Sequence, residues 1–167
     1  FSCETGPQVS LEDDLARRDL SINAMAEDRD GCLIDPYGGA QDVRDGLLRH
    51  VSDAFVEDPL RVLRGMQFAA RFELKAAEET FSLARTIKGT YRELAQERVR
   101  EEWFKWAEKA KRPSLGLGFL VQTEWVEHFP ELNATRGVAQ DPEWHPEGDV
   151  FTHTAHCCDE LVHLEAW

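Results

Sequence analysis

The chain has 167 residues, of which 42% are hydrophobic and 31% carry a charge. This composition is typical of a folded globular protein and excludes a wholly disordered one. No apolar run approaches the ~20 residues that a membrane-spanning helix needs, so we expect no membrane protein. The net charge of −13 argues against a protein that coats nucleic acid non-specifically.

The basic side chains are concentrated in the middle of the chain. Residues 53–112 contain 13 of the 19 lysines and arginines and have a net charge of +2, whereas residues 1–52 and 113–167 have net charges of −6 and −9. A polyanion would be attracted to the middle and repelled by both ends. Solvated helix faces would give the same small excess, so charge alone does not identify a partner.

The first third of the chain predicts a mixture of helix and strand. Ser10 can cap a helix, with Asp13 completing a capping box. Apolar residues alternate over 20–26 and an extended pattern resumes over 32–35, with an Asp-Gly turn between them, which indicates a hairpin. The remaining elements expected here are a short helix over 40–46 and a brief strand over 48–51.

From residue 58 onward, apolar residues recur at helical spacing. Asp58 is a suitable N-cap and Pro59 suits the first helical position. Prolines and a glycine then predict a loop-rich connector. The fold class is therefore α+β and mostly α. The helices expected are at about 58–72, 77–87, 96–109 and 115–128, with a last one from about 150.

An arginine and a carboxylate mark the end of the first predicted helix. Arg18 and Asp19 stand where the chain passes from helix to strand. Such a junction can direct a guanidinium toward phosphate and a carboxylate toward ribose hydroxyls. A surface ion pair would explain the same residues, so this motif alone does not decide the function.

The helix predicted from residue 58 has polar side chains on one face. Asp58, Arg61 and Arg64 fall in one sector, opposite the apolar face. A carboxylate acceptor and a guanidinium donor one turn apart can pair with the edge of a nucleobase. The alternative is an ordinary i,i+3 salt bridge. Upstream, Gly38 and Gly39 permit positive φ and a close approach of the backbone, as a tight turn also requires.

Histidines and carboxylates occur together near the end of the chain. The histidines of residues 144–156 and the carboxylates near them offer the donor atoms that transition metals prefer; the residues are His145, Glu147, Asp149, His153 and His156. Solvent-facing or helix-capping histidines are the alternative. The pattern therefore suggests a metal site without establishing one.

Together these segments resemble the bacterial class II tRNA nucleotidyltransferases, the CCA-adding enzymes, and the related bacterial poly(A) polymerases. LARRDLSINAMA at 15–26 resembles the ribose-selecting motif, residues 35–49 the flexible linker motif, and EDPLR at 57–61 the nucleobase template motif. ERV at 97–99 resembles the start of a neck helix. Residues 144–154 are similar to the join to the HD phosphohydrolase domain that some CCA-adding enzymes carry.

The resemblance implies transfer of CMP and then AMP from CTP and ATP onto the 3′ end of tRNA, assisted by Mg²⁺. It also implies that the protein itself selects the base, through Asp58 and Arg61. The residues implied to bind the nucleotide are Arg18, Asp19, Asn23, Asp58, Arg61 and Arg64. Those implied for the hinge are Asp42 and Arg49, and those for RNA binding are Arg98 and Arg100.

The resemblance divides the chain into three parts. They are the C-terminal part of a nucleotidyltransferase head domain with a remnant of its sheet (1–52), a helical neck that binds nucleobase and RNA (53–140), and the start of an HD domain (141–167). His153 would be the first ligand of a divalent metal in that HD domain, at an incomplete site. We expect a cytoplasmic protein, and a homodimer if apolar residues of the last helix are exposed. Those residues are Val150, Leu161 and Leu164.

One departure from the family is clear. The family's catalytic Gly-rich segment and its two metal-binding carboxylates lie upstream of the ribose motif, and nothing in this sequence matches them. We therefore expect a truncated portion of a larger enzyme, inactive by itself. The alternatives are a poly(A) polymerase fragment and a non-catalytic RNA or protein interaction module. The residues at the HD join favour CCA addition over polyadenylation.

Overall fold

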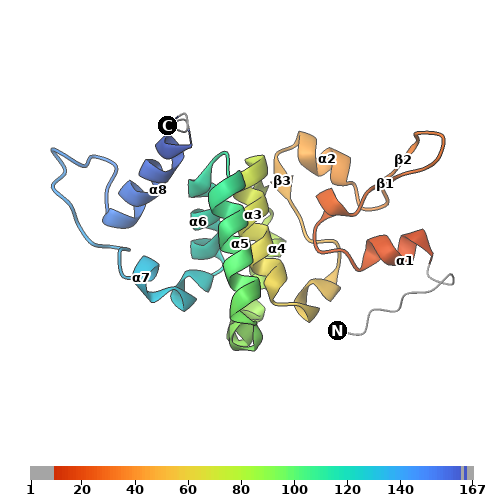
Figure 1. Cartoon of the computed structure of the whole chain (residues 1–167), viewed down its shortest axis with the longest axis horizontal. Helices are drawn as coiled ribbons and strands as arrows, with labels where there is room; N and C mark the ends of the chain where they lie inside the picture. Colours follow the sequence, from red (N-terminus) through yellow and green to blue (C-terminus); the bar gives the residue numbers. More distant parts are fainter. Residues whose placement is uncertain (1–9, 163, 165–167) are drawn as a thin grey trace.

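Four helices form the centre of the molecule, with smaller elements on both sides (Figure 1). The computed structural model describes residues 10–162 and residue 164. Helices dominate and the sheets are small, which confirms the α+β, mostly α fold class. The central helices are α3 (Leu60–Phe72), α4 (Glu78–Thr86), α5 (Gln96–Lys109) and α6 (Pro113–Gln122).

The segment before α3 lies on one side of these helices (Figure 1). Its strands β1 and β2 pair antiparallel. Strand β3 pairs parallel with β4 (Lys75–Ala76), and α3 forms the connection between the two. The elements of this segment are α1 (Leu11–Ala16), η1 (Ser21–Asn23), β1 (Ala26–Glu27), β2 (Leu33–Ile34), α2 (Gly39–Arg44), β3 (Leu47–Leu48) and η2 (Asp53–Glu57).

The elements after α6 lie on the opposite side, with a long loop between α7 and α8 (Figure 1). Helix α8 is fastened to the start of α6, because Asp159 accepts hydrogen bonds from the backbone N–H and the hydroxyl of Ser114, at 2.8 and 2.6 Å. The other 3₁₀ and α-helices are η3 (Lys88–Glu93), η4 (Trp125–His128), α7 (Pro130–Asn133) and α8 (Val150–Leu161).

Helices α3 and α6 pack closely because each has a glycine at the contact. A Cβ on Gly65 would lie 2.7 Å from the Phe119 ring, and one on Gly116 would lie 2.8 Å from the carbonyl oxygen of Met66. Protein interiors tolerate little extra volume at such contacts. The two glycines therefore fix the distance between the helices that support the candidate site.

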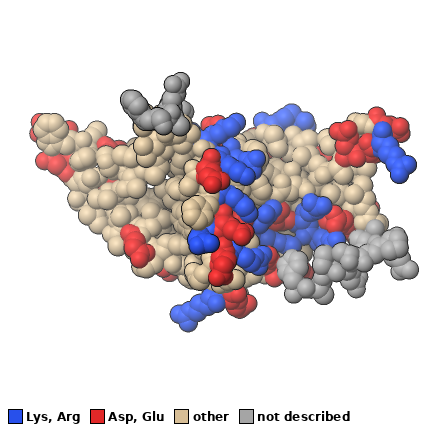
Figure 2. Space-filling model, in the orientation of Figure 1, with Lys and Arg blue, Asp and Glu red and all other residues tan. Residues whose placement is uncertain are grey.

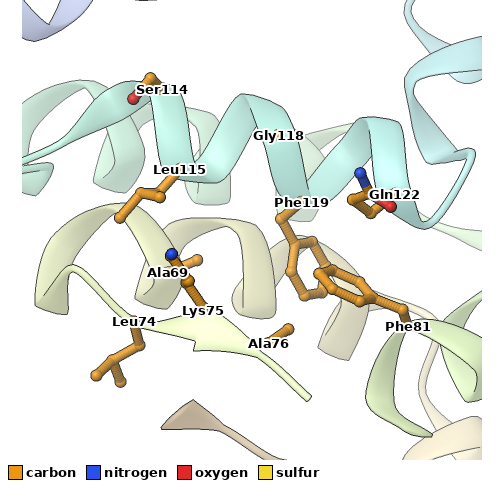
Figure 3. A pocket seen from close by; sticks show the side chains of 10 residues that line it. All are labelled: Ala69, Leu74, Lys75, Ala76, Phe81, Ser114, Leu115, Gly118, Phe119 and Gln122. Atoms are coloured by element: carbon orange, nitrogen blue, oxygen red, sulfur yellow. The ribbon is translucent and has the colours of Figure 1, made fainter. Parts of the chain in front are cut away.

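A cavity of about 360 Å³ lies between α3, β4, α4 and α6 (Figure 3). Its lining is mostly apolar, with the rings of Phe81 and Phe119 5.5 Å apart at one end. Its polar side chains include those of Lys75 and Ser114. None of its ten lining residues belongs to the predicted nucleotide-binding set, so the cavity is separate from the candidate site.

The helix predicted at 96–109 is confirmed at both ends, and those at 58–72 and 77–87 within two residues. The hairpin predicted from 20–26 and 32–35 is confirmed only near its turn, where β1 pairs antiparallel with β2, and it is wrong at residues 21–23, which form the 3₁₀ helix η1. The predicted helix at 115–128 divides at Glu124, whose φ of 62° is left-handed. Strand β4 was not predicted, since it depends on pairing with β3, which is distant in sequence. Helix α7 was not predicted either, and it is only four residues long.

No helix in the described part of the chain is long and apolar enough to cross a membrane. Leu161, at the end of α8, and Leu164, just after it, are 61% and 62% exposed. Val150, which was expected to be exposed with them, is only partly exposed. The homodimer and the three domain boundaries stay predictions.

Candidate nucleotide-binding site

The buried carboxylate of Asp19 joins the turn after α1 to the face of α3. Its Oδ1 accepts hydrogen bonds from the backbone N–H of Leu20 (3.0 Å) and from Asn23 Nδ2 (3.2 Å). Its Oδ2 accepts one from Arg64 Nε at 2.5 Å. The fold thus brings together three of the predicted nucleotide-binding residues, Asp19, Asn23 and Arg64, although up to 45 residues separate them in sequence.

Arg64 remains charged in this cluster. Burial alone would lower the pKa of its guanidinium, but the hydrogen bond and charge of Asp19 outweigh it, so the pKa is raised. The side chain is about one-third exposed (34%), and it lies over the Phe68 ring, 5.3 Å from its centroid. A fixed, partly exposed guanidinium of this kind suits a phosphate or a ribose oxygen.

Arg61 is buried and binds backbone rather than side chains. Its Nη1 donates to the carbonyl oxygen of Ala54 (2.6 Å) and its Nη2 to that of Arg17 (2.8 Å). These bonds tie the end of α1 and the turn η2 to the first turn of α3. The guanidinium has five N–H groups, so donors remain after both bonds are made.

Asp58 lies one turn before Arg61 and has its own partners. Its Oδ1 accepts from the backbone N–H of Leu60 (3.0 Å). The N-cap of α3 is Pro59, without a side-chain hydrogen bond, so the prediction of Asp58 as the N-cap is wrong by one residue. The Oδ2 of Asp58 pairs with Arg98 Nη2 of α5 at 2.7 Å. The Asp58 and Arg61 side chains share one region but bind different groups, so base selection by the pair stays a prediction.

Arg18 lies at the edge of the cluster and is half exposed. It forms an ion pair with Asp14 at 2.7 Å, and Arg17 pairs with the other oxygen of the same carboxylate at 2.7 Å. Hydrogen bonds from Arg18 and then from Arg17 lower the pKa of Asp14. Asp13 is engaged in the capping box with Ser10. These carboxylates therefore do not fit a Mg²⁺ centre, since their oxygens already have cationic or hydroxyl partners.

The two predicted hinge residues, Asp42 and Arg49, contact each other. Asp42 is buried, accepts from the Ser21 hydroxyl at 2.6 Å and pairs with Arg49 at 3.3 Å. Arg49 also pairs with Glu79 of α4. The backbone carbonyl of Arg49 accepts from the Ser21 N–H at 2.9 Å. Residue 21 thus fastens both hinge residues to the turn that carries Asp19.

The glycine pair before α2 meets two separate requirements. Gly38 has a left-handed φ of 69°, and Gly39 lies so close to the Ser21 carbonyl that a Cβ would collide with it. Both uses that the sequence suggested, positive φ and close backbone approach, are confirmed. Glycine at 39 therefore sets the distance between α2 and η1.

The two arginines predicted to bind RNA differ in their surroundings. Arg98 is occupied by Asp58, whereas Arg100 is exposed on α5 and lies 5.9 Å from the centroid of the Phe104 ring. Figure 2 shows the Lys and Arg side chains gathered over the central helices and interspersed with acidic ones. RNA binding by these arginines stays a prediction.

A second cluster, the histidine cluster, consists of His145 and Glu147 in the loop before α8 and of His153 in the first turn of α8. Glu147 Oε1 accepts from His153 Nδ1 and lies 3.3 Å from His145 Nδ1. A hydrogen bond from its own backbone N–H, followed by that from His153, lowers the pKa of Glu147 to about 2. His153, predicted as a metal ligand, therefore has two potential co-ligands within reach.

Sequence reasoning missed several partners in the nucleotide site. Arg98 was assigned to RNA, yet it binds Asp58 across the contact between α3 and α5. Ser21 and Glu79 were not assigned a role, yet they hold the hinge residues. These contacts depend on how the helices cross, and the spacing of residues in the sequence does not predict how helices cross.

Comparisons with known proteins show what this chain is similar to. Residues 3–49 match the family model described as "Poly A polymerase head domain". The chain is 48% identical over 98% of its length to the "Multifunctional CCA protein" of Vibrio cholerae (strain O395), and 45% identical over 99% to that of Vibrio vulnificus (strain YJ016). The chain is thus similar over nearly its whole length to proteins named for CCA addition. It spans 42% of the length of these two relatives.

Solved structures of the family have the same fold. One, "Thermotoga maritima CCA-adding enzyme complexed with tRNA_CCA", matches 84% of this chain and 34% of its own, with a TM-score of 0.65 and 30% identity. Another, "The complex structure of CCA-adding enzyme with CTP", matches 72% of this chain and 31% of its own, with a TM-score of 0.63 and 34% identity. The similarity in sequence and the similarity in fold thus point to the same group of proteins.

Proposed function

We propose that this chain forms the nucleotide-selecting part of a CCA-adding tRNA nucleotidyltransferase, which adds CMP and AMP from CTP and ATP to the tRNA 3′ end. The observation that carries the proposal is the joining of the ribose motif to the template helix. Asp19 binds Arg64, and Arg61 binds the carbonyl of Arg17. Two motifs distant in sequence thus form one polar surface.

In this proposal, Asp58 and Arg61 present an acceptor and a donor to the base edge. Backbone groups already hold both side chains, Leu60 N–H for the carboxylate and two carbonyls for the guanidinium. Fixed groups discriminate well, because a wrong base leaves buried polar atoms unpaired. An incoming base would displace Arg98 from Asp58, and Arg18 with Arg64 would approach the phosphates and ribose.

We propose that Mg²⁺ serves the transfer, as in related enzymes. When bound, it would stabilise the developing charge on the pyrophosphate leaving group and activate the 3′ hydroxyl. Asp13 and Asp14 already bind Ser10 and two arginines, so we assign neither as its ligand. The expected location is the cytoplasm, where tRNA is processed.

The test is a chimaera in which this chain replaces the matched segment of the Vibrio cholerae protein. We expect CTP and ATP incorporation into tRNA lacking CCA, and loss of base preference in Asp58→Asn. The matched control is Glu108→Gln, which also neutralises one carboxylate, but an exposed one on α5. Retained C and A selectivity in Asp58→Asn would contradict the proposed role of that residue, and an inactive but folded chimaera would contradict the proposal itself.

One observation favours polyadenylation as a second candidate, because the matching family model is named for poly(A) polymerase. Sustained extension with ATP alone would identify that activity. A non-catalytic interaction module is the third reading. CTP-dependent chemical-shift changes at Asp58 and Arg61 in the isolated chain would contradict it, and their absence, with tRNA still bound, would support it.

A further inference from the structure

We propose that the cavity between α3, β4, α4 and α6 is a binding site for a small organic anion, one with a flat aromatic body and a single carboxylate. The carboxylate would pair with the ammonium of Lys75, and the aromatic body would lie against Phe81 and Phe119. None of the residues that line the cavity belongs to the predicted nucleotide-binding set. The inference therefore does not depend on the proposed function.

The cavity has the size and the lining of a small-molecule site. Its volume is about 360 Å³. Sites for small ligands have volumes of roughly 300–1,000 Å³ and combine a mostly apolar wall with a few polar groups that orient the ligand. Three of the ten lining residues are polar, namely Lys75, Ser114 and Gln122. The site therefore suits a ligand that is apolar over most of its surface.

Lys75 gives the cavity a positive charge that nothing nearby neutralises. No Asp or Glu is among the lining residues, and Lys75 forms no ion pair with the described part of the chain. The hydroxyl of Ser114 already donates to Asp159 at 2.6 Å. Figure 3 shows the Lys75 side chain extending from β4 toward α6. A single cation beside an apolar wall favours a ligand with one negative charge over a polyphosphate.

The aromatic part of the ligand follows from the other end of the cavity. There the rings of Phe81 and Phe119 lie 5.5 Å apart at an interplanar angle of 48°, and a third ring can join such a pair in the tilted arrangement that aromatic groups prefer. Gly118 leaves room for it, because a Cβ at this position would meet nothing within 4 Å. In Figure 3, Lys75 lies nearer the start of α6 and the two rings nearer its end. The ligand would thus lie along α6.

The walls of the cavity are held in place by contacts that do not involve a ligand. The Leu74 N–H donates to the carbonyl of Ala69 at 3.1 Å, and the Lys75 N–H donates to the carbonyl of Gly46 at 2.8 Å. The Phe119 ring packs so closely on Gly65 that a Cβ there would lie 2.7 Å from it. A preformed site loses little conformational freedom when a ligand binds.

The test is a titration of the whole chain with 2-naphthylacetate, followed by NMR of the leucine methyl groups. We expect saturable shifts at Leu74 and Leu115, which line the cavity, and none at the exposed Leu161 of α8. The neutral isostere 2-naphthylacetamide should bind about threefold more weakly, the size of effect expected for a partly exposed ion pair. Excess CTP should not compete.

Two variants test the two ends of the site, each with a matched control. Lys75→Gln should abolish the difference between the acid and the amide, whereas Lys109→Gln, which removes an exposed lysine of α5, should preserve it. Gly118→Leu should fill the cavity and prevent binding of both compounds. Gly89→Leu makes the same change at another open position and should leave binding intact. Circular dichroism would verify that the variants fold.

Four outcomes would overturn the proposal. The first is the absence of shifts at Leu74 and Leu115, or their persistence in Gly118→Leu. The second is equal affinity of the acid and the amide, which would exclude an anionic ligand. Competition by CTP would assign the compound to a nucleotide site. Self-association of the free chain that is lost in Gly118→Leu would assign the cavity to a second copy of the chain.

Discussion

The nucleotide site and the histidine cluster hold their polar side chains in opposite ways. At the nucleotide site, Asp19 and Arg61 are buried, and their partners lie up to 45 residues away in sequence. At the histidine cluster, all three side chains are partly exposed and lie within nine residues. The first arrangement requires the whole fold, whereas the second requires only one loop and one helix turn.

This difference predicts different responses to mutation. Removing a buried partner leaves another buried polar group unsatisfied, which costs stability across the fold. Removing a partly exposed partner exposes the remaining group to water at little cost. Substitutions at the nucleotide site should therefore lower the free energy of unfolding, whereas substitutions at His145, Glu147 or His153 should change it little.

The largest effect is expected for Arg61→Ala. The carbonyls of Ala54 and Arg17 would lose their donors, and α1 and η2 would detach from α3. We expect a loss of about 3 kcal/mol in the free energy of unfolding, measured with urea. Arg44→Ala is the control, because that side chain is exposed and binds only Gln41 among the described contacts. A loss below about 1 kcal/mol in Arg61→Ala would contradict the role given to Arg61.

Gly39→Ala should have the next largest effect. The added methyl group would collide with the Ser21 carbonyl and push α2 away from η1. Overpacking of this kind costs about 2 kcal/mol, again measurable with urea. Gly118→Ala provides the comparison, since its Cβ would meet nothing within 4 Å, and helix propensity makes that change neutral or slightly stabilising. Equal effects of the two substitutions would refute the close approach.

Asp159→Ala tests the attachment of α8 to α6. Ser114 would lose two hydrogen bonds at the start of α6, at a cost of about 1 kcal/mol. Hydrogen exchange should accelerate in α8 and remain unchanged in α3 and α5. Glu160→Ala changes an exposed neighbour and should alter neither helix. If hydrogen exchange accelerated throughout the molecule, α8 would not open independently of the other helices.

The smallest effect concerns pH. Burial lowers the pKa of His50 from 6.5, against the opposing charges of Glu79 and Asp53. The unfolded chain therefore binds a proton more readily than the folded one, so stability is lost as pH falls below about 6.5 toward the folded value. His50→Gln should flatten this part of the stability curve, whereas the exposed His156→Gln should not. An unchanged slope in His50→Gln would exclude His50 as the cause.

The sequence predicted the helices better than the contacts between them. The helix at 96–109 follows from its apolar spacing alone. The pairing of Asp58 with Arg98 depends on how α3 crosses α5, and that crossing is set by side chains in the core. Residues 20–24 have the alternation of a strand, yet Leu20 and Ser21 are both buried, which a strand with one exposed face would not allow.

The two sites also differ in how far their residues are separated in sequence, and therefore in how well the sequence predicts them. His145, Glu147 and His153 are near one another in sequence, so their proximity was open to prediction from spacing. The family resemblance assigned Asp19 and Arg64 to the same set of residues but did not predict the hydrogen bond between them, because they are 45 residues apart in sequence. Local clusters are therefore accessible to sequence reasoning, and clusters assembled by tertiary packing are not.

The hydrogen bonds of Arg61 have a mechanical consequence. One guanidinium couples the end of α1, the turn η2 and the first turn of α3. We therefore expect these three segments to respond together when Arg61 is substituted. In the proposed function, Arg98, which lies on a separate helix and is half exposed, is the side chain that would move to admit a pyrimidine and then a purine.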